Sequence, residues 1–435
     1  MSEHPTLESL DPIPEADRIF TLASYVPFWW SSLIVVQAFL VGLFMIVPVG
    51  PLNLVQAGVV TLVSSLFIAV LFAANAYPGM RQGIPFTVQL RSSFGIRGAP
   101  VMAGVRILPA FVWYGIGSWI GAQAADEITR SLFGFGSVPL YFVVFTVVQT
   151  VLAIAGIRSI KWFDVSLASL VVCFLGYIAF AALSELRLSE VPAWQAEGTW
   201  GRPFLVMVAA SVSALITGAV NVADLSRHLR SSARDNWLGH LLGIAPPYIF
   251  MLGTGVLAGL VTGEEEPVAA LTHLAPSPAV ALLLLAFIIA AQFTTNLTLN
   301  ILPPAHFFQD LFGTSWTTSV VATSAFSMLC MPWLLLESGN FLQFLAWIGL
   351  GLGPILGVML GDHWIVRRRR GAEVTHLYDA SHRSPFWFTR GFRPAGLVSV
   401  LAATGLSIGS LELSWVIGLP TAAILYPILV RLEPG

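Results

Sequence analysis

Charged residues are scarce in this chain of 435 amino acids. Lys, Arg, Asp and Glu together make up 10% of the residues, whereas hydrophobic residues make up 56%. Soluble domains carry about one quarter charged residues, because their surface faces water. The composition therefore argues against a soluble enzyme, a disordered chain and a nucleic-acid binder. It indicates a protein whose outer surface faces a lipid bilayer.

Cysteine is scarcer still, and the first residues do not have the pattern of a secretion signal. The two cysteines, Cys173 and Cys330, both lie in apolar runs. This excludes a disulfide scaffold and a Cys-based metal site, and we interpret both as buried free thiols. The first 20 residues are acidic and have no basic n-region, so we expect a cytoplasmic tail rather than a signal peptide.

Long apolar runs occupy most of the chain. A helix that crosses a bilayer needs about 20 mostly apolar residues, and such runs must be helical because lipid cannot satisfy backbone polar groups. We find twelve, which predicts an all-α integral membrane protein with twelve transmembrane helices. The predicted spans lie near 27–47, 53–76, 100–124, 137–156, 163–184, 203–224, 237–261, 278–300, 316–336, 341–365, 395–411 and 414–431.

Basic and acidic residues are sorted between the connections. With the N-terminus inside, most Arg residues fall in inner connections, including the run Arg367–Arg370, and the run Glu264–Glu266 falls outside. This positive-inside pattern predicts a multi-pass protein of the plasma (inner) membrane with both termini in the cytoplasm. The Gly-rich connection at 79–99 predicts a short amphipathic or re-entrant segment on the cytoplasmic side.

The span count also suggests a division of the chain. Two halves of five spans each would have opposite orientations in the membrane, as in many secondary transporters with a site at the midplane. We therefore expect a cytoplasmic tail at 1–26, a ten-helix core at 27–394 with inverted repeats at about 27–184 and 203–365, and two extra helices at 395–435.

The predicted span at 278–300 carries an unusual density of polar residues. Gln292, Asn296 and Asn300 are four residues apart and form one stripe on a helix. Hydroxyls lie beside this stripe at Thr294, Thr295 and Thr298, with Ala291 one turn above Thr295. Asn and Thr also hold helices together, but six polar residues in nine positions favour a binding site.

The chemistry of this stripe narrows the ligands. Adjacent hydroxyls with freed carbonyls form an all-oxygen site, which suits a small hard cation such as Na⁺. Amides offer a donor and an acceptor together, which suits a neutral planar solute. Two further candidates are the lone Gln37 and Trp113 at mid-span, which is either a stacking platform for a flat ring or a packing residue.

Charged residues are expected to be missing from the middle of the first, third, sixth and eighth spans. A proton relay needs a carboxylate or His at depth, so we favour Na⁺ coupling and an uncharged substrate, with H⁺ as the alternative ion. Asp224 and Arg227, one turn apart at the inner end of the sixth span, are either a gate or a surface pair. His306 and Asp310 are interpreted as a solvated helix end.

Five segments together resemble the nucleobase–cation symporter-1 family, the purine, pyrimidine, hydantoin and allantoin permeases. They occur in the family order and at the family spacing, from about residue 20 to the C-terminus. The segments are GIPFTVQLRSSFGIRGAP at 83–100, VWYGIG at 112–117, NVADLSRH at 221–228, TTNLTLNILPPAHFFQDLF at 294–312 and GPILGVMLGDHWIVRRRRGAEVTHLYD at 353–379.

This resemblance implies a leucine-transporter-type fold of five plus five inverted helices and two extra helices. It implies cation symport by alternating access, with no enzyme activity, no organic cofactor and no obligate protein partner. The implied Na⁺ site uses the carbonyls of Leu33, Val36 and Ala291 and the hydroxyls of Thr294 and Thr295. The implied substrate site uses Gln37, Trp113 and Asn300, with Asn296 nearby.

The sequence departs from the family pattern at two places in this implied site. Gly117 replaces a Gln of the hydantoin transporter, and Leu215, preceded by Ala214, stands where characterised members have an aromatic ring. Thr217 is then the nearest hydroxyl. We expect a substrate to stack on Trp113 and to meet an aliphatic wall opposite. The rival functions are a proton-coupled nucleobase permease and an amino-acid transporter of the same fold.

Overall fold

A computed structural model describes residues 9–155, 200–336 and 338–433, together with 173, 176–181, 183 and 184. Within these residues the chain is helical, with isolated bridges and no regular strand, which confirms the all-α prediction. The main helices are α1 (Leu22–Leu33), α2 (Val36–Leu43), α3 (Leu54–Gln82), α6 (Gly98–Phe133), α7 (Val138–Ile154), α10 (Arg202–Asn221), α12 (Ala233–Thr262), α13 (Pro267–His273), α14 (Pro278–Thr295), α15 (Leu302–Phe312), α16 (Trp316–Met328), α17 (Ser338–Leu360), α19 (Pro394–Ser407) and α20 (Ser414–Leu432).

Shorter helical turns connect them. The π-helical turn η2 joins α14 to α15, and a second one, η4, follows α17. The short elements are η1 (Glu15–Asp17), α4 (Phe86–Gln89), α5 (Arg91–Phe94), α11 (Ala223–Ser226), η2 (Asn296–Asn300), η3 (Pro332–Leu334), η4 (Gly361–Val366), α18 (Val374–Tyr378) and η5 (Ile408–Leu413).

The count of spans differs in detail from the prediction of twelve. Among the described residues, seven helices are long and apolar enough to cross a membrane, or eight if the bent pair α1–α2 is one span. The helices α7 and α16 fall short of this length, and α19 and α20 are joined through η5, with non-helical Ser410 at the kink. The predicted span at 163–184 lies largely outside the described residues.

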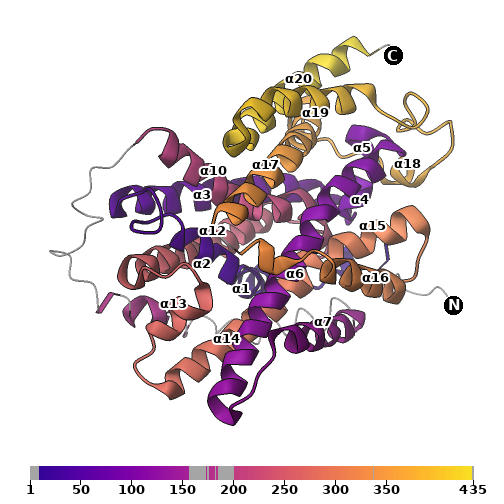
Figure 1. Ribbon diagram of the computed structural model, residues 1–435. Coiled ribbons are helices and arrows are strands. Elements are labelled where there is room, and N and C mark those ends of the chain that lie inside the picture. Colours follow the sequence, from indigo (N-terminus) through magenta and orange to yellow (C-terminus); the bar gives the residue numbers. More distant parts are fainter. Residues whose placement is uncertain are drawn as a thin grey trace.

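Helix α6 runs through the middle of the molecule (Figure 1), where it contacts α7, α10, α14, α15 and α17. The outer surface is apolar, with side chains such as Leu108, Val151 and Leu401 more than half exposed. Such a surface suits lipid and not water. It also corrects one prediction: Cys173 is exposed and Cys330 is only partly buried, because an apolar residue in a membrane protein can face outward.

Local signals set several helix ends. Asn53 and Gln56 form a capping box at the start of α3, and Gly83 ends that helix with φ of 73°. After this glycine, the connection at 79–99 folds into the two short helices α4 and α5, where a short amphipathic or re-entrant segment was expected. Ser232 caps α12 by accepting a hydrogen bond from the Asp235 amide.

The first described residues are packed against the protein, and α1 begins at Leu22 where we expected a span from 27. The buried Arg18 guanidinium donates to the backbone carbonyls of Met80 and Leu229. The Tyr378 hydroxyl donates to the carbonyl of Leu10, and burial raises the pKa of Tyr378, which keeps this donor protonated. Residues 9–20 and α18 thus lie on one face of the molecule.

The C-terminal end of α20 belongs to the same face. Arg393 pairs with Glu433 at 3.2 Å and also donates to the carbonyl of Ser92 in α5. Arg91 on α5 donates to the carbonyl of Leu377 on α18. We call the layer formed by residues 9–20, α4, α5, α18 and the C-terminal end of α20 the terminal face.

Close contact between α2 and α12 depends on two glycines. A Cβ on Gly255 would lie 2.1 Å from the carbonyl oxygen of Phe39, and one on Gly42 would lie 2.3 Å from that of Leu252. Small residues let membrane helices approach in this way. These backbone contacts leave no space for a side chain.

We therefore expect Gly255→Val to lower the stability of the protein by at least about 1–3 kcal/mol, the usual cost of overpacking. Gly253→Val is the matched control, because nothing lies within 4 Å of a Cβ at that position. Thermal unfolding of the purified protein in detergent measures both. Equal melting temperatures for the two variants would contradict the packing argument.

Candidate functional site

The first span is broken in the interior of the protein. Helix α1 ends at Leu33 and α2 begins at Val36, with an angle of 55° between them. Ile34 and Val35 between the helices have non-helical backbone angles. Such a break frees backbone carbonyls that would otherwise bond within the helix, and in a membrane it is tolerated where protein or a cavity surrounds it.

The two adjacent hydroxyls of α14 lie against the end of α1. Thr294 Oγ1 is 3.2 Å from the carbonyl oxygen of Ser31 and 2.9 Å from that of Ala291. Thr295 Oγ1 is 3.2 Å from the carbonyl oxygen of Ser32 and 3.0 Å from that of Ala291. These contacts bring the three predicted cation ligands of the eighth span together with the first span. The other two, Leu33 and Val36, flank the break.

A narrow cavity lies between this break, α6, α10, α12 and η2. It contains six of the eight residues predicted for the substrate site: Gln37, Trp113, Ala214, Leu215, Thr217 and Asn300. None of its lining residues is charged. The other lining residues are Val35, Ala38, Gly218, Tyr248, Thr295 and Leu299.

Two amide side chains in this cavity are held by a second amide on α14 or η2. The Gln37 side chain donates from Nε2 to Gln292 Oε1 at 3.0 Å, and Asn300 donates from Nδ2 to Asn296 Oδ1 at 2.9 Å. Gln37 Oε1 is buried and has no partner within the described parts of the chain. The predicted stripe of Gln292, Asn296 and Asn300 thus faces the protein interior.

The remaining two predicted substrate residues, Gly117 and Asn296, lie behind the cavity lining. A Cβ on Gly117 would lie 2.8 Å from Gln292 Oε1 and 2.9 Å from the Asn296 amide. The missing side chain at 117 therefore makes room for the amides that support Gln37 and Asn300.

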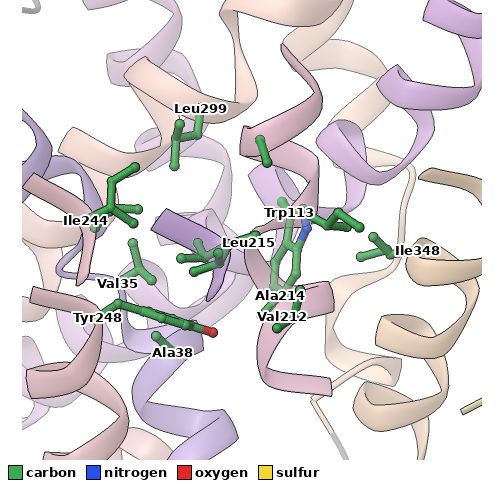
Figure 2. Packing of buried hydrophobic residues seen from close by; sticks show 14 of the residues in the cluster. Val35, Ala38, Trp113, Val212, Ala214, Leu215, Ile244, Tyr248, Leu299 and Ile348 are labelled. Carbon is green, nitrogen blue, oxygen red and sulfur yellow. The ribbon is translucent and has the colours of Figure 1, made fainter. Parts of the chain in front are cut away.

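Trp113 forms one side of the cavity. Its ring packs edge-on against Phe344, with a centroid distance of 5.1 Å, and its Nε1 is buried without a partner among the described residues. Figure 2 shows Leu215 between Trp113 and Val35 in that view. The cavity also contains a second aromatic ring, Tyr248 on α12. Sequence reasoning missed Tyr248, although a polar-tipped ring deep in an apolar span was a usable signal.

Arg106 is a charged residue of the third span that lies near one end of the predicted range 100–124 and not in its middle. Its side chain is fully buried on α6. The guanidinium donates to the carbonyl of Thr217 at 2.7 Å, to Asn221 Oδ1 at 2.6 Å and to the carbonyl of Leu299 at 3.4 Å. Thr217 and Leu299 both line the cavity. Arg106 therefore lies beneath the cavity and joins α6, α10 and η2.

The interpretation of Asp224 and Arg227 as a surface pair is wrong, and so is that of His306 as part of a solvated helix end. Asp224 is buried, accepts a hydrogen bond from the Phe86 amide and lies 3.1 Å from Nδ1 of His306, which is itself 2% exposed. Arg227 is also buried, and its guanidinium donates to the carbonyl of Ser9.

Asp310 is likewise not solvated. Its side chain is 5% exposed and forms an ion pair with Arg91 of α5. The reason is the terminal face, since α4 and α5 cover the end of the eighth span. No group of three or more His, Cys, Asp or Glu side chains suited to a metal ion occurs in the described ranges.

The comparisons with known proteins agree with this geometry. Residues 12–426 match the family of permeases for cytosine/purines, uracil, thiamine and allantoin. A hydantoin permease from Microbacterium maritypicum is 30% identical over 364 residues, which is 80% of this chain and 73% of the relative. An allantoin permease from Bacillus subtilis is 24% identical over 98% of this chain and 93% of its own length.

A solved structure has the same fold. Mhp1, a nucleobase-cation-symport-1 family transporter in a closed conformation with bromovinylhydantoin bound, superposes with a TM-score of 0.87 at 26% identity. The match covers 98% of this chain and 95% of Mhp1. It confirms the expected membrane-transporter fold of the leucine-transporter type, and these relatives are transporters, not enzymes.

We expect Arg106→Leu to destabilise the protein by about 3 kcal/mol, because it leaves buried acceptors of α10 and η2 without a donor. Arg202→Leu is the control, since its ion pair with Glu412 is exposed and is expected to contribute below about 1 kcal/mol. Thermal unfolding in detergent compares them. If both variants melt at the same temperature, the hydrogen bonds of Arg106 to α10 and η2 do not stabilise the protein.

Proposed function

This chain belongs to the family of permeases for cytosine/purines, uracil, thiamine and allantoin, and we propose that it transports a neutral, planar nitrogen heterocycle by cation symport with alternating access. Nucleobases, hydantoins and allantoin-like compounds form the proposed substrate class. The observation that carries the proposal is the buried cavity at the helix break, which combines Trp113 with two amides and has no charged lining residue. An uncharged lining favours an uncharged solute, because a buried unpaired charge is costly.

Each cavity residue has a proposed role. The ring of the substrate stacks on Trp113, and Gln37 and Asn300 hydrogen-bond to its polar edge. Leu215 with Ala214 supplies the opposite apolar wall, and Thr217 supplies a hydroxyl. Gly117 and Asn296 lie behind the cavity lining. Gly117 leaves space for the supporting amides, and Asn296 holds the side chain of Asn300.

The proposed coupling ion is Na⁺, carried as a co-substrate. Its ligands would be the hydroxyls of Thr294 and Thr295 and the carbonyls of Ala291, Leu33 and Val36. Support comes from the oxygen-only surroundings of the two hydroxyls, since hard cations prefer oxygen ligands. Mhp1 is described as a nucleobase-cation symporter.

Coupling between the two ligands would run through Thr295. This residue lines the cavity and also contacts the carbonyl of Ser32 at the end of α1. A cation that holds α14 against α1 would therefore also fix one wall of the cavity. By linkage, each ligand must then raise the affinity for the other.

The proton is the alternative coupling ion, and one observation favours it. Asp224 and His306 form a buried pair beside the terminal face, and proton relays use such groups at depth. An amino-acid substrate is disfavoured, because its carboxylate would meet no cationic side chain in the cavity lining.

The proposed location is the plasma (inner) membrane with the terminal face in the cytoplasm. Both described ends of the chain belong to this face, as an even number of spans requires. We keep the proposed division into a tail at 1–26, inverted repeats at about 27–184 and 203–365 within 27–394, and two extra helices at 395–435.

The double substitution Thr294→Ala/Thr295→Ala should abolish the stimulation of substrate uptake by Na⁺, because it removes two of the proposed ligands. Thr298→Ala is the matched control, since its hydroxyl bonds to carbonyls of its own helix and should leave the stimulation intact. Uptake into proteoliposomes with a Na⁺ gradient or a pH gradient measures the effect. Uptake that follows the pH gradient and ignores the substitutions would assign coupling to H⁺.

Trp113→Ala should weaken substrate binding by about tenfold or more, since stacking and burial of an aromatic ring contribute one or more kcal/mol. Trp119→Ala on the same helix is the control, because Trp119 packs on Trp333 and Phe142 away from the cavity. Calorimetric titration with hydantoin, uracil and allantoin reports the affinities. An unchanged affinity in Trp113→Ala would remove its stacking role.

A further inference from the structure

Asn296 is the centre of a buried hydrogen-bond network behind the cavity. Its Nδ2 lies 3.2 Å from the carbonyl oxygen of Tyr114 and 3.2 Å from Gln149 Oε1, and also contacts Ser118 Oγ at 3.4 Å. Its Oδ1 accepts the hydrogen bond from Asn300. Asn296, Tyr114, Ser118 and Gln149 are all fully buried.

One member of this network has a fixed polarity. A backbone carbonyl can only accept a hydrogen bond, so the amino group of Asn296 must face Tyr114. Its carbonyl oxygen must then face Asn300, and the amino group of Asn300 must face Asn296. The orientation of a side-chain amide is otherwise ambiguous and follows from its network. Here the chain of partners ends on a group that cannot be reversed.

The consequence reaches the cavity. Asn300 lines it, and its amino group is committed to Asn296. The carbonyl oxygen Oδ1 of Asn300 is therefore the group left for a ligand. No donor in the described part of the protein reaches this oxygen. Because Asn296 Oδ1 faces Asn300, reversal of the Asn300 amide would place two buried carbonyl oxygens against each other.

We propose that Asn296 is a positioning residue that fixes Asn300 as a hydrogen-bond acceptor, so that the cavity selects heterocycles with a ring N–H at that edge. This inference rests on the proposed function and adds its specificity. Gln37 Oε1, buried and without a partner in the described residues, is a second acceptor on the cavity lining. A ring that carries a methyl group on the nitrogen facing Asn300 would leave the acceptor unpaired.

Space for the hydrogen-bond network of Asn296 depends on Gly117. A Cβ there would come within 2.9 Å of both polar atoms of the Asn296 amide. The absence of a side chain on α6 thus lets Asn296 reach Tyr114 and Asn300 at once. The hydrogen-bond network of Asn296 therefore depends on the glycine at position 117.

The test compares affinities for a parent ring and its N-methyl derivatives. Hydantoin, 1-methylhydantoin and 3-methylhydantoin, with uracil and its two N-methyl derivatives as a second set, are titrated by calorimetry into the purified full-length protein. In the wild type, methylation at one ring nitrogen should weaken binding by about tenfold or more, the cost of one unpaired buried acceptor. The ratio of the two affinities is the readout.

Asn296→Leu and Asn296→Thr should lower this ratio to about threefold or less, because Asn300 can then rotate and offer its amino group. Ser118→Ala is the control and should keep the wild-type ratio, since the bond from Asn296 to Tyr114 remains. Size-exclusion chromatography checks folding, and Asn296→Thr carries the test if Asn296→Leu does not fold. A purely structural role would weaken the parent and methylated rings equally.

Three results would overturn a proposal, and they are distinguishable. If the wild type binds the parent and the N-methyl rings equally well, the positioning role is wrong while the transported class stands. The same holds if the Asn296 variants keep the wild-type ratio of the two affinities. If no nitrogen heterocycle binds to the wild type, the proposed function itself is wrong.

Discussion

The polar residues of the eighth span, from Gln292 to Asn300, are the feature on which the rest of the site depends. Lipid cannot satisfy a polar side chain, so polar side chains of a membrane protein favour partners within the protein. The polar residues of the eighth span find such partners on three different elements. Thr294 reaches the end of α1, Gln292 reaches Gln37 of α2, and Asn296 reaches Tyr114 of α6. The candidate site lies where these three contacts converge.

This arrangement also explains why the first span can be broken. The break at Ile34 and Val35 costs intrahelical hydrogen bonds, which would be expensive if lipid surrounded it. The hydroxyls of Thr294 and Thr295 lie against the last carbonyls of α1 and compensate part of that loss. The same contacts create the oxygen-rich surroundings that suit a cation. The atoms that stabilise the break are thus the same oxygens that form the proposed cation site.

The sequence revealed the features that follow from local pattern. The stripe of Gln292, Asn296 and Asn300 was visible because four-residue spacing places side chains on one helix face, and its interior position was expected because polar residues avoid lipid. Tertiary partners were not visible. His306 and Asp310 looked solvated because they follow an apolar run, but His306 lies against Asp224 of α11 and Asp310 pairs with Arg91 of α5. No periodicity predicts that a distant connection folds over a helix end.

Arg106 shows a different limit of sequence reasoning. A single Arg near the end of an apolar run is typical of a residue that extends to the membrane surface. In this fold α10 and η2 offer it buried acceptors, and the guanidinium turns inward. It now bonds to the backbone of two residues that line the cavity, Thr217 and Leu299. The guanidinium therefore joins α6, α10 and η2 in the layer beneath the cavity, because its acceptors belong to α10 and η2 while its backbone belongs to α6. Any change in the relative position of these three elements would break hydrogen bonds of a buried cation, which is costly.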